Sequence, residues 1–539
     1  WEYKRYIKLQ TYNLLKLMGD LYGVYKKNSF SRIPPTPIGL KNILKNGNFY
    51  CEYAEGFDIN FFETREIFVF VFGFLSNINE LATNKSLENL NNAELISLLY
   101  LEDKNNFQKK LMGNFSIFIF DKKLNSLLII RDHFGSRPIY IYENEDALIV
   151  SDEIETLVNS LDINLSLNIE RMTSYLALDF LNSKETFYKE INKIEPSCLI
   201  SIDCKRKIYS SYEYENVKNN KELKEIPDEF ERLFERSVSN SIKSSHKSAI
   251  MLSGGLDSSA VTIALTKLGY VNLETYSANF SHLTKQALKL SDEKEFQEII
   301  SGLTPYKHFS ISLENISPLK SLDNHLDTFK EPFHMPNAYL FDQIVSKATS
   351  RGIQVIIDGQ DGDNVISHGL ERFLEMFRNL KLFSLISEIF DYAEFNKIKK
   401  INLIRFLLNQ LIIKIGIKRK VSKNNTILTN KVFYDKSIYN PSKRSALDSH
   451  FEKINSPHHA LAFEYRYKYF KKFKIHTRSP FYDKKLINFC LNLNSKWKLN
   501  KGKTRYILRL YLENKVPEKL YNRRSKANLF RLKIKLCPL

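Results

Sequence analysis

The sequence has few cysteines, and none of them is arranged for a structural bridge or a metal site. Five cysteines in 539 residues are scattered and form no CxxC pair: Cys51, Cys198, Cys204, Cys490 and Cys537. This spacing excludes a disulfide framework and a cysteine-based zinc site. Free, dispersed cysteines are typical of a reducing compartment, so we expect a cytoplasmic protein.

Long apolar runs are also missing. The strongest run, Ile67–Leu75, has the length of a β-strand, whereas a membrane-spanning helix needs about 18 or more apolar residues. The first ten residues, WEYKRYIKLQ, lack the apolar core of a secretory signal. The sequence therefore predicts no membrane partner.

What is present is the composition of a large globular protein. Hydrophobic residues make up 43% of the chain, charged residues 26% and aromatic residues 13%. These values exclude a disordered or collagen-like chain. The length of 539 residues predicts between two and four domains.

Positive charge is concentrated at one end of the chain. Residues 401–539 contain 33 Lys and Arg against 7 Asp and Glu, while the whole chain has a net charge of +19. One interpretation is a surface that attracts a polyanion such as nucleotide phosphates, RNA or an acidic peptide. The other is a lysine-rich composition on solvated helix faces, although compositional bias alone does not explain confinement to one quarter.

Two patterns divide the chain. Residues 1–218 are rich in short β-branched and aromatic runs, which predict strands at 67–75, 115–121, 126–131 and 139–141. The polar segment 219–225 is the expected linker. From 226 to 539, strands at 248–252, 275–280 and 355–357 alternate with helical patterns at 227–244, 258–268, 293–301 and 338–350, and helices dominate after about 380. Such alternation predicts a doubly wound parallel sheet.

A phosphate-binding loop is the most specific motif. Ser253-Gly254-Gly255-Leu256-Asp257-Ser258-Ser259 follows a predicted strand and opens a predicted helix. The glycines allow backbone N–H groups to approach phosphate oxygens, and the helix N-terminus favours an anion. Asp257 suits a Mg²⁺ ion that neutralises pyrophosphate. A kinase-type P-loop is excluded because no Gly-Lys-Ser/Thr follows. The alternative is a Ser/Gly turn that only caps a helix.

The run MLSGGLDSSAV resembles the pyrophosphate loop of the asparagine-synthetase-like ATP pyrophosphatases, which include asparagine synthetase, β-lactam synthetases and lasso-peptide cyclases. Similar blocks extend over most of the chain: 111–121, RDHFGSRPIY at 131–140, Asp292-Glu293, Lys330–Phe333, Asp358–Asp363, Arg478–Asp483 and Gly502–Tyr506. The resemblance implies a glutamine-amidotransferase-like domain at 1–218, an Ntn-type β-sandwich flanked by helices. It also implies an ATP-pyrophosphatase domain at 226–539, a doubly wound parallel sheet with a helical, basic C-terminal part.

The resemblance also implies an ATP-dependent carbon–nitrogen ligase that needs Mg²⁺. A carboxylate would attack ATP to give an acyl-adenylate and pyrophosphate, and an amine would then displace AMP. Lys526 occupies the place of the catalytic lysine, although the arginine-to-lysine spacing is one residue longer. Asp257 and Asp363 would hold the metal. The residues expected to contact ATP are Leu252, Ser253, Gly254, Gly255, Leu256, Asp257, Ser258, Ser259, Tyr276, Ser277, Ala278, Gly359, Lys503 and Arg505. Among them, Leu252 and the segment 276–278 would flank adenine, and Lys503 and Arg505 would contact phosphate.

The chain departs from the glutamine-dependent members of this superfamily at its N-terminal domain. Those members begin with a cysteine nucleophile, whereas this sequence begins with Trp1 and has its first cysteine at position 51. The Arg-Gly-Pro-Asp-type motif of a working glutaminase is also absent. We expect a degenerate domain that does not hydrolyse glutamine.

The synthetase half departs at its substrate positions. The resemblance implies that Gln360, His476 and Arg478 contact the substrate. Gln360 and His476 stand where asparagine synthetase has glutamates, which weakens the case for aspartate and ammonia as substrates. Glu464, 19 residues before Asp483, matches the glutamate that the β-lactam-forming branch uses to deprotonate an amine, so it is a candidate general base. The alternative for Glu464 is an ion pair with Lys468 on one helix face.

Three functions fit these observations. The leading hypothesis is macrolactam formation in a ribosomal peptide, as in lasso-peptide cyclases, which join a peptide's N-terminal amine to an Asp or Glu side chain. A precursor-processing protease or a leader-binding protein would be a partner. The second is ammonia-dependent amidation of a small carboxylate. The third is an RNA-binding enzyme that adenylates a tRNA base, which the amidotransferase-like half argues against.

Overall fold

A computed structural model gives the fold of the protein. It describes residues 21–27, 42–54, 56, 58–83, 90–161, 163–177, 180, 182–203, 207–211, 225–242, 246–279, 293–313, 322–329, 331–333, 338–401 and 446–524. The chain forms two compact units. The N-terminal unit contains residues 1–213, 324–335 and 457–472, and the second unit contains 214–323, 336–456 and 473–539. Most of the linker expected at 219–225 lies outside the described residues.

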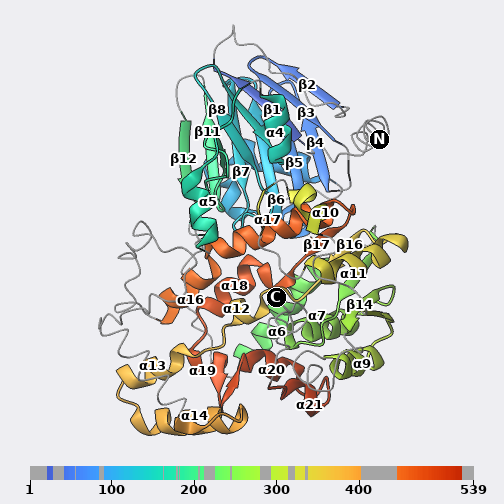
Figure 1. The fold of residues 1–539 in the computed structure, drawn as a ribbon, viewed down its shortest axis with the longest axis vertical. Helices are drawn as coiled ribbons and strands as arrows, with labels where there is room; N and C mark the ends of the chain where they lie inside the picture. The colour runs from blue at the N-terminus through green and yellow to red at the C-terminus, as the bar shows by residue number, and fades with distance from the viewer. Residues whose placement is uncertain are drawn as a thin grey trace. The chain divides into compact units, whose positions relative to one another are not determined.

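The N-terminal unit is built on two antiparallel six-stranded sheets (Figure 1). One has the order β10-β8-β9-β1-β3-β2 and the other β12-β11-β7-β6-β5-β4. The strands are β1 Leu21–Lys26, β2 Asn42–Asn46, β3 Phe49–Tyr53, β4 Ile59–Glu63, β5 Ile67–Leu75, β6 Gly113–Asp121, β7 Ser126–Arg131, β8 Tyr140–Glu143, β9 Ala147–Ser151, β10 Ile191–Lys193, β11 Cys198–Ile202 and β12 Lys207–Ser211. The helices are α2 Ile78–Thr83, α3 Asn92–Glu102, α4 Ile154–Ser160, α5 Ile169–Leu176, α10 Leu322–Phe329 and α17 Pro457–Lys471, with a 3₁₀ turn at Phe107–Lys110.

The apolar run of β5 is explained by burial on both faces. Phe68, Phe70 and Phe72 face the core between the two sheets, whereas Ile67 and Val69 face the opposite side, where α3 packs. Each fully buried side chain of this size contributes about 2 kcal/mol to stability. Because helices cover the outer faces of both sheets, this unit has the helix-flanked sandwich predicted for the first domain.

The second unit contains a parallel sheet of five strands in the order β15-β14-β13-β16-β17. The strands are β13 Ser248–Met251, β14 Glu274–Asn279, β15 Lys307–Ser312, β16 Val355–Ile357 and β17 His476–Arg478, with a short hairpin of β18 Leu499–Asn500 and β19 Lys503–Thr504. Figure 1 shows α11 and α9 on opposite sides of β14. The predicted doubly wound parallel sheet is therefore confirmed.

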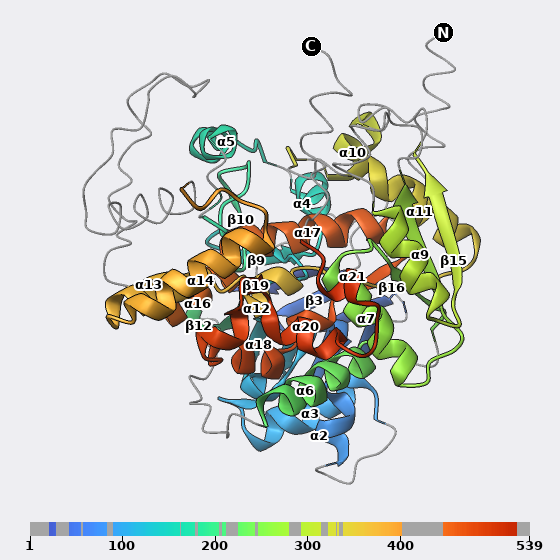
Figure 2. The same cartoon turned by 90° about the horizontal axis from the view of Figure 1, so that it is seen from below.

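The helices of the second unit are α6 Ile226–Asn240, α7 Leu256–Lys267, α9 Lys294–Gly302, α11 Ala338–Ser350, α12 Gly362–Ile366, α13 Glu371–Arg378, α14 Leu382–Phe395, α16 Ala446–Ile454, α18 Lys484–Leu491, α19 Ser495–Lys498, α20 Tyr506–Leu512 and α21 Glu518–Tyr521, with a 3₁₀ turn at Pro480–Tyr482. Of these, α9 and α11 lie beside the sheet, whereas α13 and α14 lie apart from it, at the left of Figure 2. Among the described residues, no helix is both long enough and apolar enough to cross a membrane.

Strand order determines where the site lies. β13 is paired with β14 on one side and with β16 on the other, so the order of the sheet reverses at β13. In open sheets of this type, ligands bind beside the carboxyl ends of the strands at this reversal. The segments that follow β13 and β16 are the two glycine- and aspartate-containing loops singled out from the sequence.

Candidate active site

The phosphate-binding loop connects β13 to α7. Gly254 has a φ of +83°, and a Cβ atom there would lie 2.9 Å from the carbonyl oxygen of Glu293, so glycine is required for both reasons. The hydroxyl oxygens of Ser253 and Ser258 lie 2.9 Å apart, and the N–H of Gly255 donates to Ser253 Oγ at 3.2 Å. These bonds fix a tight turn whose remaining N–H groups lie at the N-terminus of α7, where an anion is favoured.

The segments predicted to flank adenine are joined at the carboxyl edge of the sheet. The N–H of Leu252 donates to the carbonyl of Tyr276 at 2.9 Å, and the hydroxyl of Ser277 donates to the carbonyl of Leu252. The hydroxyl of Tyr276 donates to Glu274 at 2.6 Å. Burial and this acceptor raise the pKa of Tyr276. The structure thus brings Leu252 and the 276–278 segment together, and their contact with adenine stays a prediction.

The second acidic loop packs directly on the first. A Cβ atom on Gly359 would lie 2.5 Å from the amide nitrogen of Ser258, and one on Gly362 would lie 2.8 Å from Asp257 Cγ. No side chain larger than hydrogen fits at either position without separating the loops. The segments 253–259 and 358–363, about 100 residues apart in the sequence, therefore form one surface.

Hydrogen bonds hold the acidic side chains of the second loop. Asp358 Oδ1 accepts from the N–H of Gln360 at 3.0 Å and from Ser479 Oγ at 2.9 Å. Asp361, in a left-handed conformation with φ of 56°, accepts from the hydroxyl of Tyr482 at 2.7 Å and from Gln360 Nε2 at 3.2 Å. The predicted substrate residue Gln360 is thus positioned by its two aspartate neighbours.

Arg505 lies against the predicted metal ligand. Its Nη1 is 2.8 Å from Oδ1 and 2.7 Å from Oδ2 of Asp257. Lys503, two residues earlier, is half-buried, and its ammonium lies 5.9 Å from the centre of the Phe395 ring. The two basic residues predicted to contact phosphate therefore differ: the structure brings Arg505 to the phosphate-binding loop and places Lys503 beside an aromatic ring.

Arg523 is a site residue that the sequence analysis did not assign. Its Nη1 donates to the carbonyl of Gly254 at 2.5 Å, and its Nη2 is paired with Glu293. The carbonyl of Arg523 accepts from Arg509, a buried residue whose pKa is lowered to about 9 by burial and by the nearby charge of Arg505. The only indication of Arg523 in the sequence is its place in the basic run 522–526. The residue predicted to be catalytic in that run, Lys526, lies outside the described residues.

The carboxylates fit a magnesium ion in number and chemistry. Mg²⁺ is commonly held by one or two carboxylates together with substrate phosphates. Asp257 is the second residue of α7, and Asp363 follows Gly362, where a Cβ atom would lie 2.8 Å from Asp257 Cγ. Among the described residues, no group of three or more His, Cys, Asp or Glu side chains forms a metal site. Asp257 and Asp363 would thus supply two carboxylates to Mg²⁺, and the phosphates of ATP would supply further ligands.

The last two predicted substrate residues lie on a strand that sequence analysis missed. His476 and Arg478 are the first and last residues of β17, which pairs with β16. The carbonyl of Arg478 accepts from the N–H of Asp358 at 3.0 Å. This bond places Arg478 beside the second acidic loop, at the carboxyl end of β17. His476 lies at the other end of the strand, two residues away.

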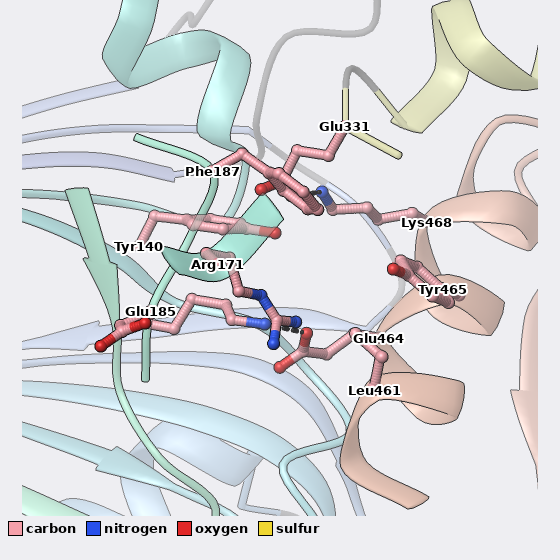
Figure 3. Close-up of a pocket in the computed structure, with 10 residues that line it drawn as sticks. Tyr140, Arg171, Glu185, Phe187, Glu331, Leu461, Glu464, Tyr465 and Lys468 are labelled. Carbon is pink, nitrogen blue, oxygen red and sulfur yellow. Dashed lines mark hydrogen bonds and ion pairs between the residues drawn. The ribbon is translucent and has the colours of Figure 1, made fainter. Parts of the chain in front are cut away.

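Glu464 differs most from its predicted role. It lies on α17, which packs within the N-terminal unit, where it is 2.7 Å from Arg131 Nη2 and 2.6 Å from Lys193 Nζ. Burial would raise the pKa of Glu464, but the attraction of the two cations outweighs it and lowers the pKa to about 2. A carboxylate with both oxygens paired and so low a pKa is a weak base. The alternative predicted for Glu464, an ion pair with Lys468 on the same helix face, is also not found, because Lys468 is paired with Glu331 (Figure 3).

Comparison with known families agrees with this architecture. The asparagine synthase family model matches residues 229–533, and the glutamine amidotransferase domain model matches residues 68–214. The chain belongs to the asparagine synthase family. This confirms the predicted superfamily and fold class.

Relatives in this family are distant. The chain is 22% identical over 477 residues to the glutamine-hydrolysing asparagine synthetase 1 of Bacillus subtilis, which covers 80% of this chain and 70% of that one. It is 23% identical over 282 residues to the glutamine-hydrolysing asparagine synthetase B of Escherichia coli, covering 50% and 46%. Across the first five curated relatives, the match spans between 29% and 70% of their own length.

A solved structure was also matched. A glutamine phosphoribosylpyrophosphate amidotransferase from Bacillus subtilis is 11% identical, with a TM-score of 0.24, over 45% of this chain and 56% of that one. A likeness this weak adds nothing to the family assignment.

Proposed function

We propose that this protein activates a carboxylate with Mg-ATP and transfers the acyl group to an amine. The carboxylate oxygen would attack the α-phosphorus of ATP with loss of pyrophosphate, and the amine would then displace AMP to form an amide. The observation that carries this proposal is the packing of loop 358–363 on loop 253–259, with Gly359 and Gly362 against Ser258 and Asp257. One surface at the carboxyl edge of the sheet then holds backbone donors for phosphate and carboxylates for a metal.

The described residues would divide the work of the adenylation step. N–H groups at the start of α7 and the hydroxyls of Ser258 and Ser259 would bind pyrophosphate oxygens. Mg²⁺ held by Asp257 and Asp363 would neutralise negative charge on the phosphates. Arg505, which contacts Asp257, would also reach the phosphates. Lys526 is proposed as the catalytic lysine on the family resemblance alone.

We favour macrolactam formation in a ribosomal peptide. Gln360 is a neutral amide where the amidation of aspartate by asparagine synthetase uses a glutamate, and its side chain is bonded to Asp361 at 3.2 Å. The strongly basic region after residue 400 suits an acidic peptide. A precursor-processing protease or a leader-binding protein would then supply the substrate.

Glutamine hydrolysis is not part of this proposal. The two described cysteines of the N-terminal unit, Cys51 and Cys198, are buried. Burial raises the pKa of Cys198 to about 11 and that of Cys51 further still. Because the thiolate is the nucleophilic form, neither thiol suits attack on glutamine.

Ammonia-dependent amidation of a small carboxylate is the second candidate. It is favoured by the relatives, several of which are described as asparagine synthetases. The proposed adenylation site serves both reactions equally, since they differ only in the carboxylate and the amine. An RNA-modifying enzyme is a weaker candidate, because a glutamine amidotransferase domain precedes the synthetase domain.

The test is a product analysis. The protein is incubated with Mg-ATP, aspartate and ammonium, and separately with acidic precursor peptides, and AMP is measured. AMP with asparagine supports the second candidate and removes the macrolactam proposal. Peptide-dependent AMP together with loss of one water from the peptide supports the first. No AMP with any substrate, from protein that is shown to bind ATP, contradicts the ligase activity itself.

A further inference from the structure

A buried histidine holds the backbone of the second acidic loop. His450 lies on α16 and is 1% exposed, and its Nε2 is 2.9 Å from the carbonyl oxygen of Asn364. Asn364 directly follows Asp363, the predicted metal ligand, and both residues belong to α12. The helices α16 and α18 pack on α12 within the second unit (Figure 1). His450 therefore reaches the loop one residue from the predicted metal ligand.

The helix α12 is too short to hold its own shape. It has five residues, Gly362–Ile366, and the last four carbonyl groups of any helix have no partner within the helix. The first turn of a helix also costs more conformational entropy than its hydrogen bonds recover. The shape of α12 must therefore be set by neighbouring groups, and His450 supplies a donor to one of its carbonyls.

Lys498 determines which nitrogen of His450 carries the proton. The ammonium of Lys498 lies 3.0 Å from His450 Nδ1. Because an ammonium group only donates hydrogen bonds, Nδ1 must be the acceptor. Burial and the charge of Lys498 lower the pKa of His450 to about 3, so the ring is neutral at neutral pH. Its single proton is then on Nε2, which donates it to the carbonyl of Asn364.

Lys498 itself makes no ion pair in the described part of the chain. It is 7% exposed, and its other hydrogen bond, of 3.4 Å, goes to the carbonyl of Leu491. Burial lowers the pKa of Lys498 to about 8, so the ammonium is still mostly protonated at neutral pH. A charge buried without a counter-charge reduces stability. The contact with His450 gives this costly charge a role, because it fixes the donating nitrogen.

Asn364 transmits this constraint to the rest of the loop. Its N–H donates to the carbonyl of Asp361 at 2.9 Å, and its Nδ2 donates to Asp361 Oδ1 at 3.0 Å. Asp361 also accepts from the hydroxyl of Tyr482. A chain of hydrogen bonds thus runs from Lys498 through His450 and Asn364 to Asp361. Asp363 lies between the last two residues of this chain in the sequence.

We propose that His450 is a positioning residue, which orients Asp363 toward the metal by holding the carbonyl of Asn364. Lys498 keeps the proton of His450 on the donating nitrogen. Groups that orient metal ligands in this way typically change metal affinity by about 10–100-fold. This inference rests on the proposed function, because Asp363 holds a metal only in that proposal.

The test is calorimetric titration of the full chain with α,β-methylene-ATP, an analogue that cannot release pyrophosphate, once with Mg²⁺ and once with EDTA. The ratio of the two affinities gives the contribution of the metal. His450→Leu keeps most of the side-chain volume but removes the donor. We expect it to weaken binding of the magnesium complex by about tenfold or more and to leave metal-free binding unchanged.

Two further variants separate positioning from general damage to the fold. His450→Gln can donate through Nε2 and accept through Oε1, so its affinity for the magnesium complex should stay within about threefold of the parent value. His308, on the edge strand β15, also makes a side-chain hydrogen bond, of 2.9 Å to Thr275. His308→Leu is therefore the matched control and should bind both forms as the parent protein does.

The inference is overturned if His450→Leu weakens both forms of the nucleotide equally, or if His450→Gln loses as much affinity as His450→Leu. It is also overturned if Mg²⁺ does not tighten binding to the parent protein. If His450→Leu does not fold, Lys498→Met gives the second measurement, and a selective loss of affinity for the magnesium complex is again expected. AMP formation by the parent protein is measured separately, and its absence would contradict the ligase function without affecting these titrations.

Discussion

Arg505 Nη1 lies within 2.8 Å of both carboxylate oxygens of Asp257, although the two residues are 248 positions apart in the sequence. Asp257 is the predicted metal ligand, and Arg505 is a predicted phosphate contact. Binding of Mg-ATP would therefore exchange this ion pair for two others, one between Asp257 and the metal and one between Arg505 and phosphate. Both residues are mostly buried, so neither charge is well solvated when the pair opens.

Asp257→Asn tests this relationship. We expect AMP formation to fall by at least about 100-fold, because the substitution removes a carboxylate from the proposed metal site. Stability should fall by about 1–3 kcal/mol, because Arg505 is left without its charged acceptor. AMP is measured by chromatography and stability by urea unfolding. Adding Arg505→Gln should recover stability without recovering activity, and a fully active single variant would show that Asp257 has no catalytic role.

Arg523→Gln should weaken ATP binding more than it weakens the fold. Its guanidinium holds the carbonyl of Gly254 and the carboxylate of Glu293, which fixes the phosphate-binding loop. We expect the KM for ATP to rise by about tenfold, equivalent to one charge-assisted hydrogen bond. Initial rates over a range of ATP concentrations measure this. The neighbouring Arg524 is exposed, so Arg524→Gln is the control. Equal effects on KM in both variants would show that Arg523 has no specific role in fixing the phosphate-binding loop.

Gly359→Ala should separate the two loops. The added Cβ would meet the amide nitrogen of Ser258 at 2.5 Å, where it cannot be accommodated without backbone movement. We expect AMP formation to fall by about 100-fold, because displacements near 1 Å at a reaction centre have effects of that size. Gly302→Ala is the matched control, since a Cβ there meets nothing within 4 Å. Normal activity of Gly359→Ala would mean that the close approach of the loops is not needed.

Glu464→Gln should act mainly on stability. The pKa of Glu464 is lowered from 4.5 to about 2, so the ionised carboxylate stabilises the fold above pH 4.5, and this contribution is lost as the pH falls from 4.5 to 2. A shift of this size corresponds to about 3 kcal/mol at neutral pH. We expect Glu464→Gln to destabilise the protein by a similar amount and to flatten its acid sensitivity.

Urea unfolding of the parent protein and the Glu464→Gln variant at pH 7 and pH 4 measures this loss. Adenylation and aminolysis are followed separately in the folded variant. Unchanged stability combined with selective loss of aminolysis would instead support the general base predicted from the sequence.

Much of the fold was predictable because its signals are local. The run at 67–75 alternates aromatic and aliphatic residues, and both sets are buried in β5, on opposite faces. The strand–loop–helix order at 248–267 was also predicted, since two glycines and a helix cap follow a short apolar strand. The acidic loop at 358–363 was found by resemblance, and its glycines explain why the motif has little freedom to vary.

Other elements had no local signal. β15 is an edge strand with half-exposed side chains, and β17 has three residues, two of them partly exposed, so neither forms an apolar run. An edge strand needs only a neighbour's backbone groups to pair with, and the sequence around it does not reveal that neighbour.

The sequence by itself determined the family, the two sheet-containing halves and the phosphate-binding loop, because these depend on local patterns of burial, turn geometry and backbone access. Only the tertiary structure decided the partners of the charged residues. It joined Arg505 to Asp257, Arg523 to Gly254 and Glu464 to Arg131 and Lys193. A buried charge must find an opposite charge or a polar group, and which one it finds depends on chain segments hundreds of residues apart that folding alone brings together.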